Sequence, residues 1–179
     1  EGSDVIVGVD GGTDSARSRK IAVTIATGDF DSIIDTEVER IALPNQNASD
    51  LGKTLQYASE KGAEVVNIIG VEGGEIDHQL AAFAALVEAP PELEIYMHMS
   101  EHVAMRCLDD LELALDQGTK LSLFAFTPCA NVSISGVEFP LEDEPLAFST
   151  RGLHNVALGG PICIESDGAL VVVVSREHN

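Results

Sequence analysis

Tryptophan is absent from this sequence, and aromatic residues make up only 4% of its 179 positions. A core built by this chain is therefore aliphatic. Hydrophobic residues still reach 45%, with a mean hydropathy of +0.13, which is enough apolar material for a sizeable core. The length fits one domain or two small ones.

Basic residues are also scarce, because Lys and Arg total 10 against 30 Asp and Glu, for a formal net charge of -20. This balance excludes the basic face that nucleic-acid binding needs. It opposes the docking of an anionic nucleotide unless divalent cations screen the site, and it attracts a cationic substrate. The acid-rich, lysine-poor composition also predicts adaptation to high salt.

Long apolar runs are missing. No run approaches the roughly 20 residues that span a bilayer, and Ala169–Val174 is short and β-branched, which predicts a buried strand. We see no basic-then-apolar leader, so we expect a cytoplasmic protein with no membrane partner. The cysteines, Cys107, Cys129 and Cys163, are odd in number and lack metal-like spacing. We expect them to be buried thiols in a reducing compartment.

The first part of the chain alternates strands and helices. The predicted strands are 5–9, 21–26, 38–43 and 65–69, and the predicted helices are 14–20, 50–61 and 79–88. This alternation is typical of a mostly parallel sheet covered by helices. We therefore predict an α/β, three-layer, Rossmann-like domain over residues 1–98.

Beyond Pro91 the pattern changes to short β candidates separated by Pro, Gly and Asp. These are 94–98, 103–107, 121–126, 132–135, 146–149, 162–165 and 170–175. Such a pattern predicts an all-β sandwich or barrel over residues 99–179. His98 and His102 are four residues apart, but no Glu or Cys accompanies them in a ligand pattern, so we assign them a surface or packing role.

The most informative motif is Gly28-Asp29-Phe30-Asp31-Ser32, which follows the apolar run 21–26. Residues two apart share one face of an extended segment, so Asp29 and Asp31 can converge on one ion. Mg²⁺ prefers oxygen ligands and usually takes one or two carboxylates plus substrate phosphates. Asp-x-Asp is also common in solvated turns. The spacing alone therefore leaves a metal site and a turn as alternatives.

Two further clusters follow predicted strands. Asp10-Gly11-Gly12 comes after 5–9, and the segment from Gly70 to His78, which contains Gly73 and Gly74, leads from 65–69 into a helix. A strand, a glycine turn and a helix start together leave backbone N–H groups available to an anion. In open α/β sheets ligands gather at the carboxyl ends of strands. Three such clusters favour a ligand site.

In order and spacing, these motifs resemble the thiamine pyrophosphokinase family. The resemblance rests on Asp10-Gly11-Gly12, the 28–33 segment, Ser49-Asp50 opening a helix, and Gly73-Gly74-x-x-Asp77-His78. It continues through Leu121–Leu123 and Ser135–Leu141, and so covers nearly the whole chain. Members of this family normally have a further strand, glycine turn and helix ahead of the first strand seen here. We expect that edge element to be missing from this sequence.

The resemblance implies an enzyme that transfers pyrophosphate from ATP to the hydroxyl of thiamine, giving thiamine diphosphate and AMP, with Mg²⁺ as cofactor. It implies a homodimer, with a thiamine pocket in the second domain. The implied catalytic and metal residues are Asp29, Asp31 and Asp50. The implied nucleotide-binding residues are Asp10, Gly11, Gly12, Ser32, Gly73, Gly74, Asp77 and His78. The implied thiamine-binding residues are Phe139 and Asn155.

The sequence departs from the family pattern at three positions. Asn47 stands where Asp is expected, Glu75 where Arg is common, and His154 where Ser is usual. Replacing a cation by an anion at residue 75 reverses a favourable contact with phosphate. Two alternatives therefore stand beside the main interpretation. One is a catalytically impaired homologue that binds thiamine or a nucleotide. The other is a pyrophosphokinase for another hydroxymethyl heterocycle, such as a pterin.

Overall fold

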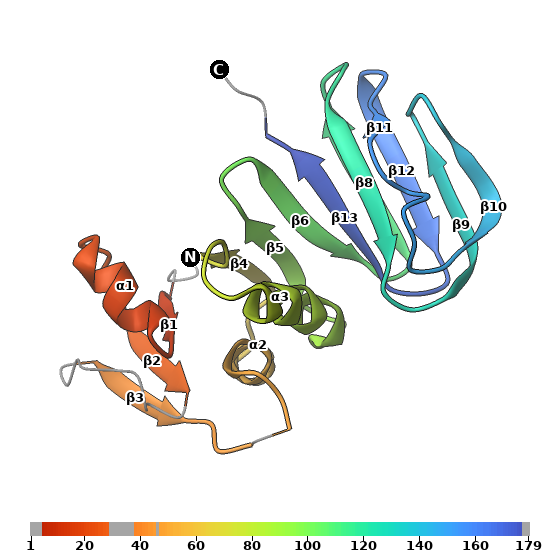
Figure 1. Cartoon of the computed structure of the whole chain (residues 1–179). Coiled ribbons are helices and arrows are strands. Elements are labelled where there is room, and N and C mark those ends of the chain that lie inside the picture. The colour runs from red at the N-terminus through yellow and green to blue at the C-terminus, as the bar shows by residue number, and fades with distance from the viewer. Residues whose placement is uncertain (1–4, 29–37, 46, 177–179) are drawn as a thin grey trace. The chain divides into compact units, whose positions relative to one another are not determined.

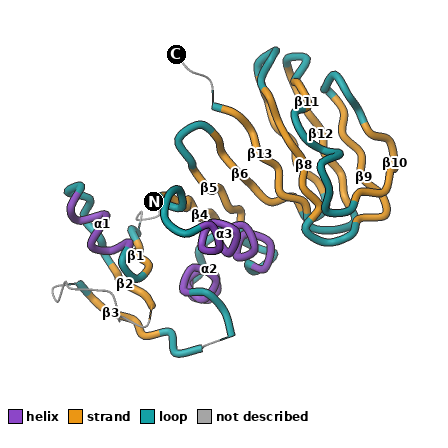
Figure 2. The backbone as a smooth tube through the Cα atoms, in the orientation of Figure 1, coloured by secondary structure: helices purple, strands orange, loops and turns teal. Residues whose placement is uncertain are grey.

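The computed structural model describes residues 5–28, 38–45 and 47–176, and the chain forms two compact units, residues 1–63 and 64–179. Strands predominate in the described residues, and their three helices all lie before residue 89 (Figures 1 and 2). No described helix is both long and apolar enough to cross a membrane.

The first unit contains a parallel three-stranded sheet in the order β1-β2-β3. Its strands are β1 (Val7–Val9), β2 (Ile25–Gly28) and β3 (Glu39–Ala42). Its helices are α1 (Gly12–Ser18) and α2 (Asp50–Glu60). All three strands run in the same direction, so their carboxyl ends meet at one edge of this sheet.

The sequence of α2 specifies both of its ends. The Ser49 hydroxyl accepts a hydrogen bond from Gly52 N at 3.2 Å, which satisfies one of the free N–H groups of the first turn. Gly62, in the left-handed region at φ +82°, follows the last turn and stops the helix. Leu55 is 1% exposed, and burying such a side chain contributes about 1.5–3 kcal/mol.

The second unit begins with a six-stranded sheet in the order β11-β8-β13-β6-β5-β4. Its strands are β4 (Val65–Ile69), β5 (Glu94–His98), β6 (His102–Cys107), β8 (Lys120–Ala125), β11 (Asn155–Val156) and β13 (Leu170–Ser175). β4 and β5 are parallel, and the other pairs are antiparallel. The helix α3 (Ile76–Glu88) connects β4 to β5 and contacts β6 and β13.

A second sheet, in the order β10-β9-β12-β7, packs on the six-stranded sheet to form a sandwich (Figure 1). Its strands are β7 (Asp110–Leu115), β9 (Cys129–Ser135), β10 (Leu141–Leu146) and β12 (Gly160–Ser166). The core between the sheets is aliphatic, as the composition predicts, and includes Val132, Ile134, Ile162 and Leu170. Strand β13 lies inside its sheet and is buried on both faces, which explains its continuous apolar sequence.

The coarse fold agrees with the prediction, and several details do not. The described residues form mixed sheets with few helices, and residues 99–179 contribute strands to both sheets of a β-sandwich, whose larger sheet also contains β4 and β5. The three-layer Rossmann-like arrangement is not confirmed. β4 and β5 pair in one mixed sheet with β6, and the predicted boundary at 98/99 falls between β5 and β6. The assignment of a separate function to each side of that boundary stays a prediction.

The strand predicted at 146–149 is wrong, because β10 ends at Leu146. The structure also contains two strands, β7 and β11, that the sequence pattern does not predict. β10 contains three acids and Pro145, which lower strand propensity, yet it is an edge strand where proline is tolerated. The prediction of buried thiols is also wrong for Cys163, which is exposed, whereas Cys107 and Cys129 are buried.

Candidate active site

Asp10 lies at the carboxyl end of β1, as the sequence predicts. Its backbone N–H donates to Thr27 O at 2.8 Å, and its carbonyl accepts from Thr13 N at 3.0 Å, at the start of α1. Its φ of +45° is left-handed, a conformation that Asp adopts more readily than most residues. Gly11 and Gly12 complete the turn into α1. The strand end and the first turn of the helix thus fix Asp10 in place.

One carboxylate oxygen of Asp10 is buried without a hydrogen-bond partner among the described residues. This atom is Oδ1. Gly28, the last residue of β2, lies against Asp10, and a Cβ on Gly28 would come within 3.4 Å of Asp10 Cβ. A buried carboxylate oxygen with no partner is costly. The arrangement therefore suits a cation or a hydrogen-bond donor.

The first turn of α2 is tied to the end of β2 through two threonines. Thr54 Oγ1 donates to Asp50 O at 2.7 Å, and it lies 2.7 Å from Thr27 Oγ1. Both threonine side chains are buried. The helix α2, which begins at Asp50, is therefore held against Thr27, the residue before the end of β2.

The Asp50 carboxylate already has a positive neighbour in the structure. Lys53 Nζ lies 2.6 Å from Asp50 Oδ1, an ion pair without hydrogen-bond geometry. The Lys53 side chain is only 8% exposed, and that of Asp50 is 30% exposed. The sequence analysis did not anticipate this pair, although an i, i+3 spacing on a helix is a signal that finds it.

Asp29, Asp31 and Ser32 lie outside the described residues. Gly28 ends β2 beside Asp10, so the motif starts at that point of the first unit. Within the described part of the chain, no group of three or more His, Cys, Asp and Glu side chains is arranged to hold a metal ion.

The glycine turn predicted between β4 and α3 is present in the second unit. Gly70, Gly73 and Gly74 all have left-handed φ, between +69° and +82°, which favours glycine at each position. Asp77 and His78 follow in the first turn of α3, where Asp77 Oδ1 accepts from His78 N at 2.8 Å. Both side chains are exposed.

Glu75 is the N-cap residue of α3, and its side chain makes no capping hydrogen bond. The free N–H groups of the first turn therefore lack a side-chain cap from this residue. An anion bound there gains from those groups and from the helix dipole. The negative charge of Glu75 competes for the same position.

Glu72, in the same turn, is held by Ser100 from the turn between β5 and β6. The Ser100 hydroxyl donates to Glu72 Oε2 at 2.7 Å, and Ser100 N donates to it at 2.6 Å. These two bonds lower the pKa of Glu72 from its ordinary value of 4.5. The pair fixes the glycine turn to the carboxyl end of β5, and no sequence motif indicated it.

Phe139 and Asn155 are brought together in the β-sandwich. Asn155 Oδ1 accepts from Phe139 N at 3.0 Å, and Asn155 Nδ2 donates to Phe139 O at 2.7 Å. The Phe139 side chain is 62% exposed. Asn155 thus holds the backbone that carries an exposed aromatic ring, which the sequence analysis did not anticipate.

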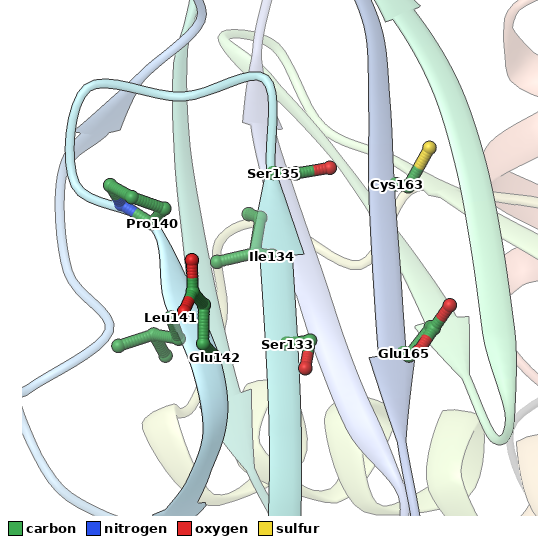
Figure 3. A pocket seen from close by; sticks show the side chains of 8 residues that line it. All are labelled: Ser133, Ile134, Ser135, Pro140, Leu141, Glu142, Cys163 and Glu165. Atoms are coloured by element: carbon green, nitrogen blue, oxygen red, sulfur yellow. The ribbon is translucent and has the colours of Figure 1, made fainter.

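A hollow of about 170 Å³ lies on the outer face of the four-stranded sheet (Figure 3). Ser133, Ser135, Cys163 and Glu165 line it, with Pro140–Glu142 and Ile134. None of the predicted site residues that the structure describes is among its lining residues.

Residues 1–97 match the sequence model described as the catalytic domain of thiamin pyrophosphokinase, more than half of the chain. The chain belongs to the thiamin pyrophosphokinase family. This match includes the aspartate clusters and the glycine turn at the strand ends. It confirms the family that the motifs indicated.

Known thiamin pyrophosphokinases are similar to this chain over most of its length. A curated thiamine pyrophosphokinase from Bacillus subtilis is 26% identical over 174 residues, covering 90% of this chain and 77% of that protein. A crystal structure of thiamine pyrophosphokinase from Bacillus subtilis has a TM-score of 0.83 at 21% identity, covering 98% and 91% of the two chains. Thiamin pyrophosphokinase from Candida albicans has a TM-score of 0.76 at 13% identity, covering 97% and 82%. At these identities the two structures establish a shared fold.

Proposed function

We propose that this chain is a thiamine pyrophosphokinase, which transfers the pyrophosphoryl group of ATP to the hydroxyl of thiamine and releases AMP. Family membership supports the reaction class, and the relative that bears this name is similar over most of both chains. The acidic surface supports a cationic acceptor such as the thiazolium of thiamine, since the net charge is -20.

The observation that carries the proposal is the buried Oδ1 of Asp10 at a strand end, which has no hydrogen-bond partner among the described residues. Strand carboxyl ends are where α/β folds bind their ligands. An oxygen of this kind fits a hard divalent cation, because Mg²⁺ takes carboxylate ligands together with phosphates. Mg²⁺ would neutralise the phosphate charge that a strongly acidic chain otherwise repels.

Asp29, Asp31 and Asp50 are the residues that we assign to the metal and to catalysis, with Asp10 beside them. Lys53 neutralises part of the Asp50 charge, so we assign Asp50 the weaker hold on the cation. The sequence places Asp29 and Asp31 directly after Gly28, which lies against Asp10.

For the nucleotide we assign Gly11 and Gly12, Ser32, and the turn that carries Gly73 and Gly74. Asp77 and His78 would contact the nucleotide from the first turn of α3. Gly73 and Gly74 are left-handed, which supports the assignment of that turn because such glycines allow close backbone approach to a phosphate. The first turn of α3 supplies N–H groups without a side-chain cap from Glu75.

For thiamine we assign Phe139 and Asn155. A cation over an aromatic face contributes about 0.5–2 kcal/mol, and the exposed ring of Phe139 is available for such a contact. Asn155 would then act by holding the Phe139 backbone. We further propose a cytoplasmic homodimer, with residues 1–98 binding ATP and residues 99–179 binding thiamine.

In this reaction the hydroxyl oxygen of thiamine forms a bond to the β-phosphorus of ATP, and the bond between that phosphorus and the oxygen bridging to the α-phosphate breaks. AMP leaves with that oxygen, and the hydroxyl proton passes to solvent or to a nearby carboxylate. Phosphoryl transfer depends mainly on positioning and charge stabilisation. The residues assigned above therefore hold the phosphates in line with the acceptor and shield their charge.

An AMP-release assay with thiamine, ATP and Mg²⁺ tests the proposal, run at low and at high KCl. We expect AMP and thiamine diphosphate in equal amounts, and neither product when Mg²⁺ is replaced by EDTA. Binding of thiamine and ATP without AMP release would instead identify a catalytically impaired homologue. AMP release with a hydroxymethyl pterin, but not with thiamine, would identify a different acceptor.

A further inference from the structure

The Arg176 side chain contacts the start of β6 and the carboxyl end of β5. It follows β13, and its backbone N–H donates to Glu101 O at 2.8 Å. Its Nη2 lies 2.8 Å from His98 Nδ1, and its Nε donates to His102 O at 3.4 Å. No motif in the sequence indicated a role for this residue.

His98 is oriented from its other side by Asn67 of β4. Its Nε2 lies 2.7 Å from Asn67 Oδ1. Arginine has no acceptor atom, so Arg176 must donate and Nδ1 must accept. Nε2 is then the nitrogen that carries the proton and donates to Asn67. The chain Asn67, His98, Arg176 fixes one guanidinium orientation.

The guanidinium of Arg176 lies at an edge where several parallel strands end. β13 and β5 each run antiparallel to β6, so their carboxyl ends lie at the same edge, together with that of their parallel neighbour β4. The glycine turn and α3 begin there, and Glu72 of that turn lies within the electrostatic reach of Arg176. Anionic ligands bind at such edges and at helix starts.

The other cations of the second unit are placed elsewhere. Arg106 donates to the carbonyls of Ala89, Pro90 and Leu93, and Arg151 pairs with Glu144. Lys120 starts β8, which lies two strands further along the sheet than β6. Among the described Lys and Arg side chains of the second unit, Arg176 is therefore the one at this edge, and its side-chain hydrogen bonds use Nε and Nη2.

We propose that Arg176 binds the phosphate chain of the nucleotide and that His98 is the residue that positions it. The proposal rests on the proposed function for the identity of the ligand. A guanidinium suits a phosphate because it offers paired N–H donors in a fixed plane. Arg176 supplies this contact at an edge where Glu72, Glu75 and Asp77 are acidic.

The test is a calorimetric titration with inorganic tripolyphosphate and Mg²⁺, without thiamine. We expect Arg176→Gln to raise the Kd about tenfold, because a charge-assisted contact is lost. Arg151→Gln removes the same charge from the same unit and should leave the Kd unchanged. Equal Kd values for Arg176→Gln and the unaltered protein overturn the proposal, as does the absence of tripolyphosphate binding. Failed AMP release with intact tripolyphosphate binding would count against the proposed function alone.

Two variants of His98 separate positioning from structure. His98→Asn keeps an acceptor oxygen near the place of Nδ1, and His98→Phe keeps a flat ring without an acceptor. We expect the Asn variant to retain most of the tripolyphosphate affinity and the Phe variant to lose about as much as Arg176→Gln. Equal losses in both variants, or none, would show that His98 does not position Arg176.

Discussion

Asp10 combines a left-handed backbone, two backbone hydrogen bonds and a buried carboxylate oxygen without a partner among the described residues. Its sequence signal was weak, because Asp-Gly-Gly after a strand also occurs in many turns. The partnerless oxygen is what separates the two interpretations. A turn aspartate normally uses its side chain on the local backbone, whereas Asp10 Oδ1 does not.

Replacing Asp10 by asparagine should therefore separate stability from activity. Asp10→Asn removes an uncompensated charge and keeps a residue that tolerates positive φ. We expect the ligand-free protein to gain about 1 kcal/mol of stability, measured by thermal melting, while AMP release falls sharply. A loss of stability without ligand would show that the carboxylate has a structural partner.

The hydrogen bonds between Asn155 and Phe139 lead to a second prediction. Asn155→Ala and Phe139→Ala should weaken thiamine binding to a similar extent, roughly 3- to 30-fold, because the first removes the hydrogen bonds that order the Phe139 backbone and the second removes the ring. Tripolyphosphate affinity should not change in either variant. Calorimetric titration with thiamine checks this. A much larger effect of Asn155→Ala than of Phe139→Ala would show that Asn155 touches the substrate directly.

At the level of elements, the start of α3 carries a charge that opposes an anion. Glu75→Arg should tighten ATP binding several-fold if the glycine turn faces phosphate. It should also lower the melting temperature slightly, because a cation at a helix N-terminus is unfavourable. The measurements are an ATP titration and a thermal melt. Unchanged or weaker ATP binding would place the phosphates away from this turn.

The sequence predicted the elements whose signals are local. Ser49 and Gly62 mark the ends of α2, and β4, β5 and β13 are found at the predicted residues. β10 was misplaced because its acids and Pro145 suit only an edge strand, and edge position is a property of the assembled sheet. Local pattern carries no such information.

In the candidate site, too, local motifs could be predicted from the sequence and long-range contacts could not. Asp10, the glycine turn and the start of α2 at Ser49-Asp50 followed from motifs, and the structure identifies Ser49 as the capping residue. The pairs Glu72 with Ser100 and His98 with Arg176 join residues 28 and 78 positions apart. Arg176 follows β13, and it comes near His98 of β5 only because both strands pair with β6. The sequence predicts a surface or packing role for His98, and its contacts with Asn67 and Arg176 are more specific than that.

At the scale of the whole molecule, the net charge of -20 predicts a dependence on salt. Self-repulsion among carboxylates destabilises a compact state, and salt screens it. We expect the melting temperature to rise from low to molar KCl. Sorbitol at equal osmolality is the control, since it leaves charges unscreened. A flat or falling melting temperature in KCl would contradict adaptation to high salt.

The central claim is that carboxylates at the strand ends of the first unit hold a divalent cation against the phosphates of ATP. The most direct measurement is AMP release as a function of Mg²⁺ concentration in Asp31→Asn, with Glu39→Gln as a control for an exposed acid on β3. The account predicts that Asp31→Asn lowers turnover about 100-fold or more and raises the Mg²⁺ concentration needed for half-maximal rate, while Glu39→Gln does neither. Undiminished turnover of Asp31→Asn with an unaltered Mg²⁺ dependence would contradict it.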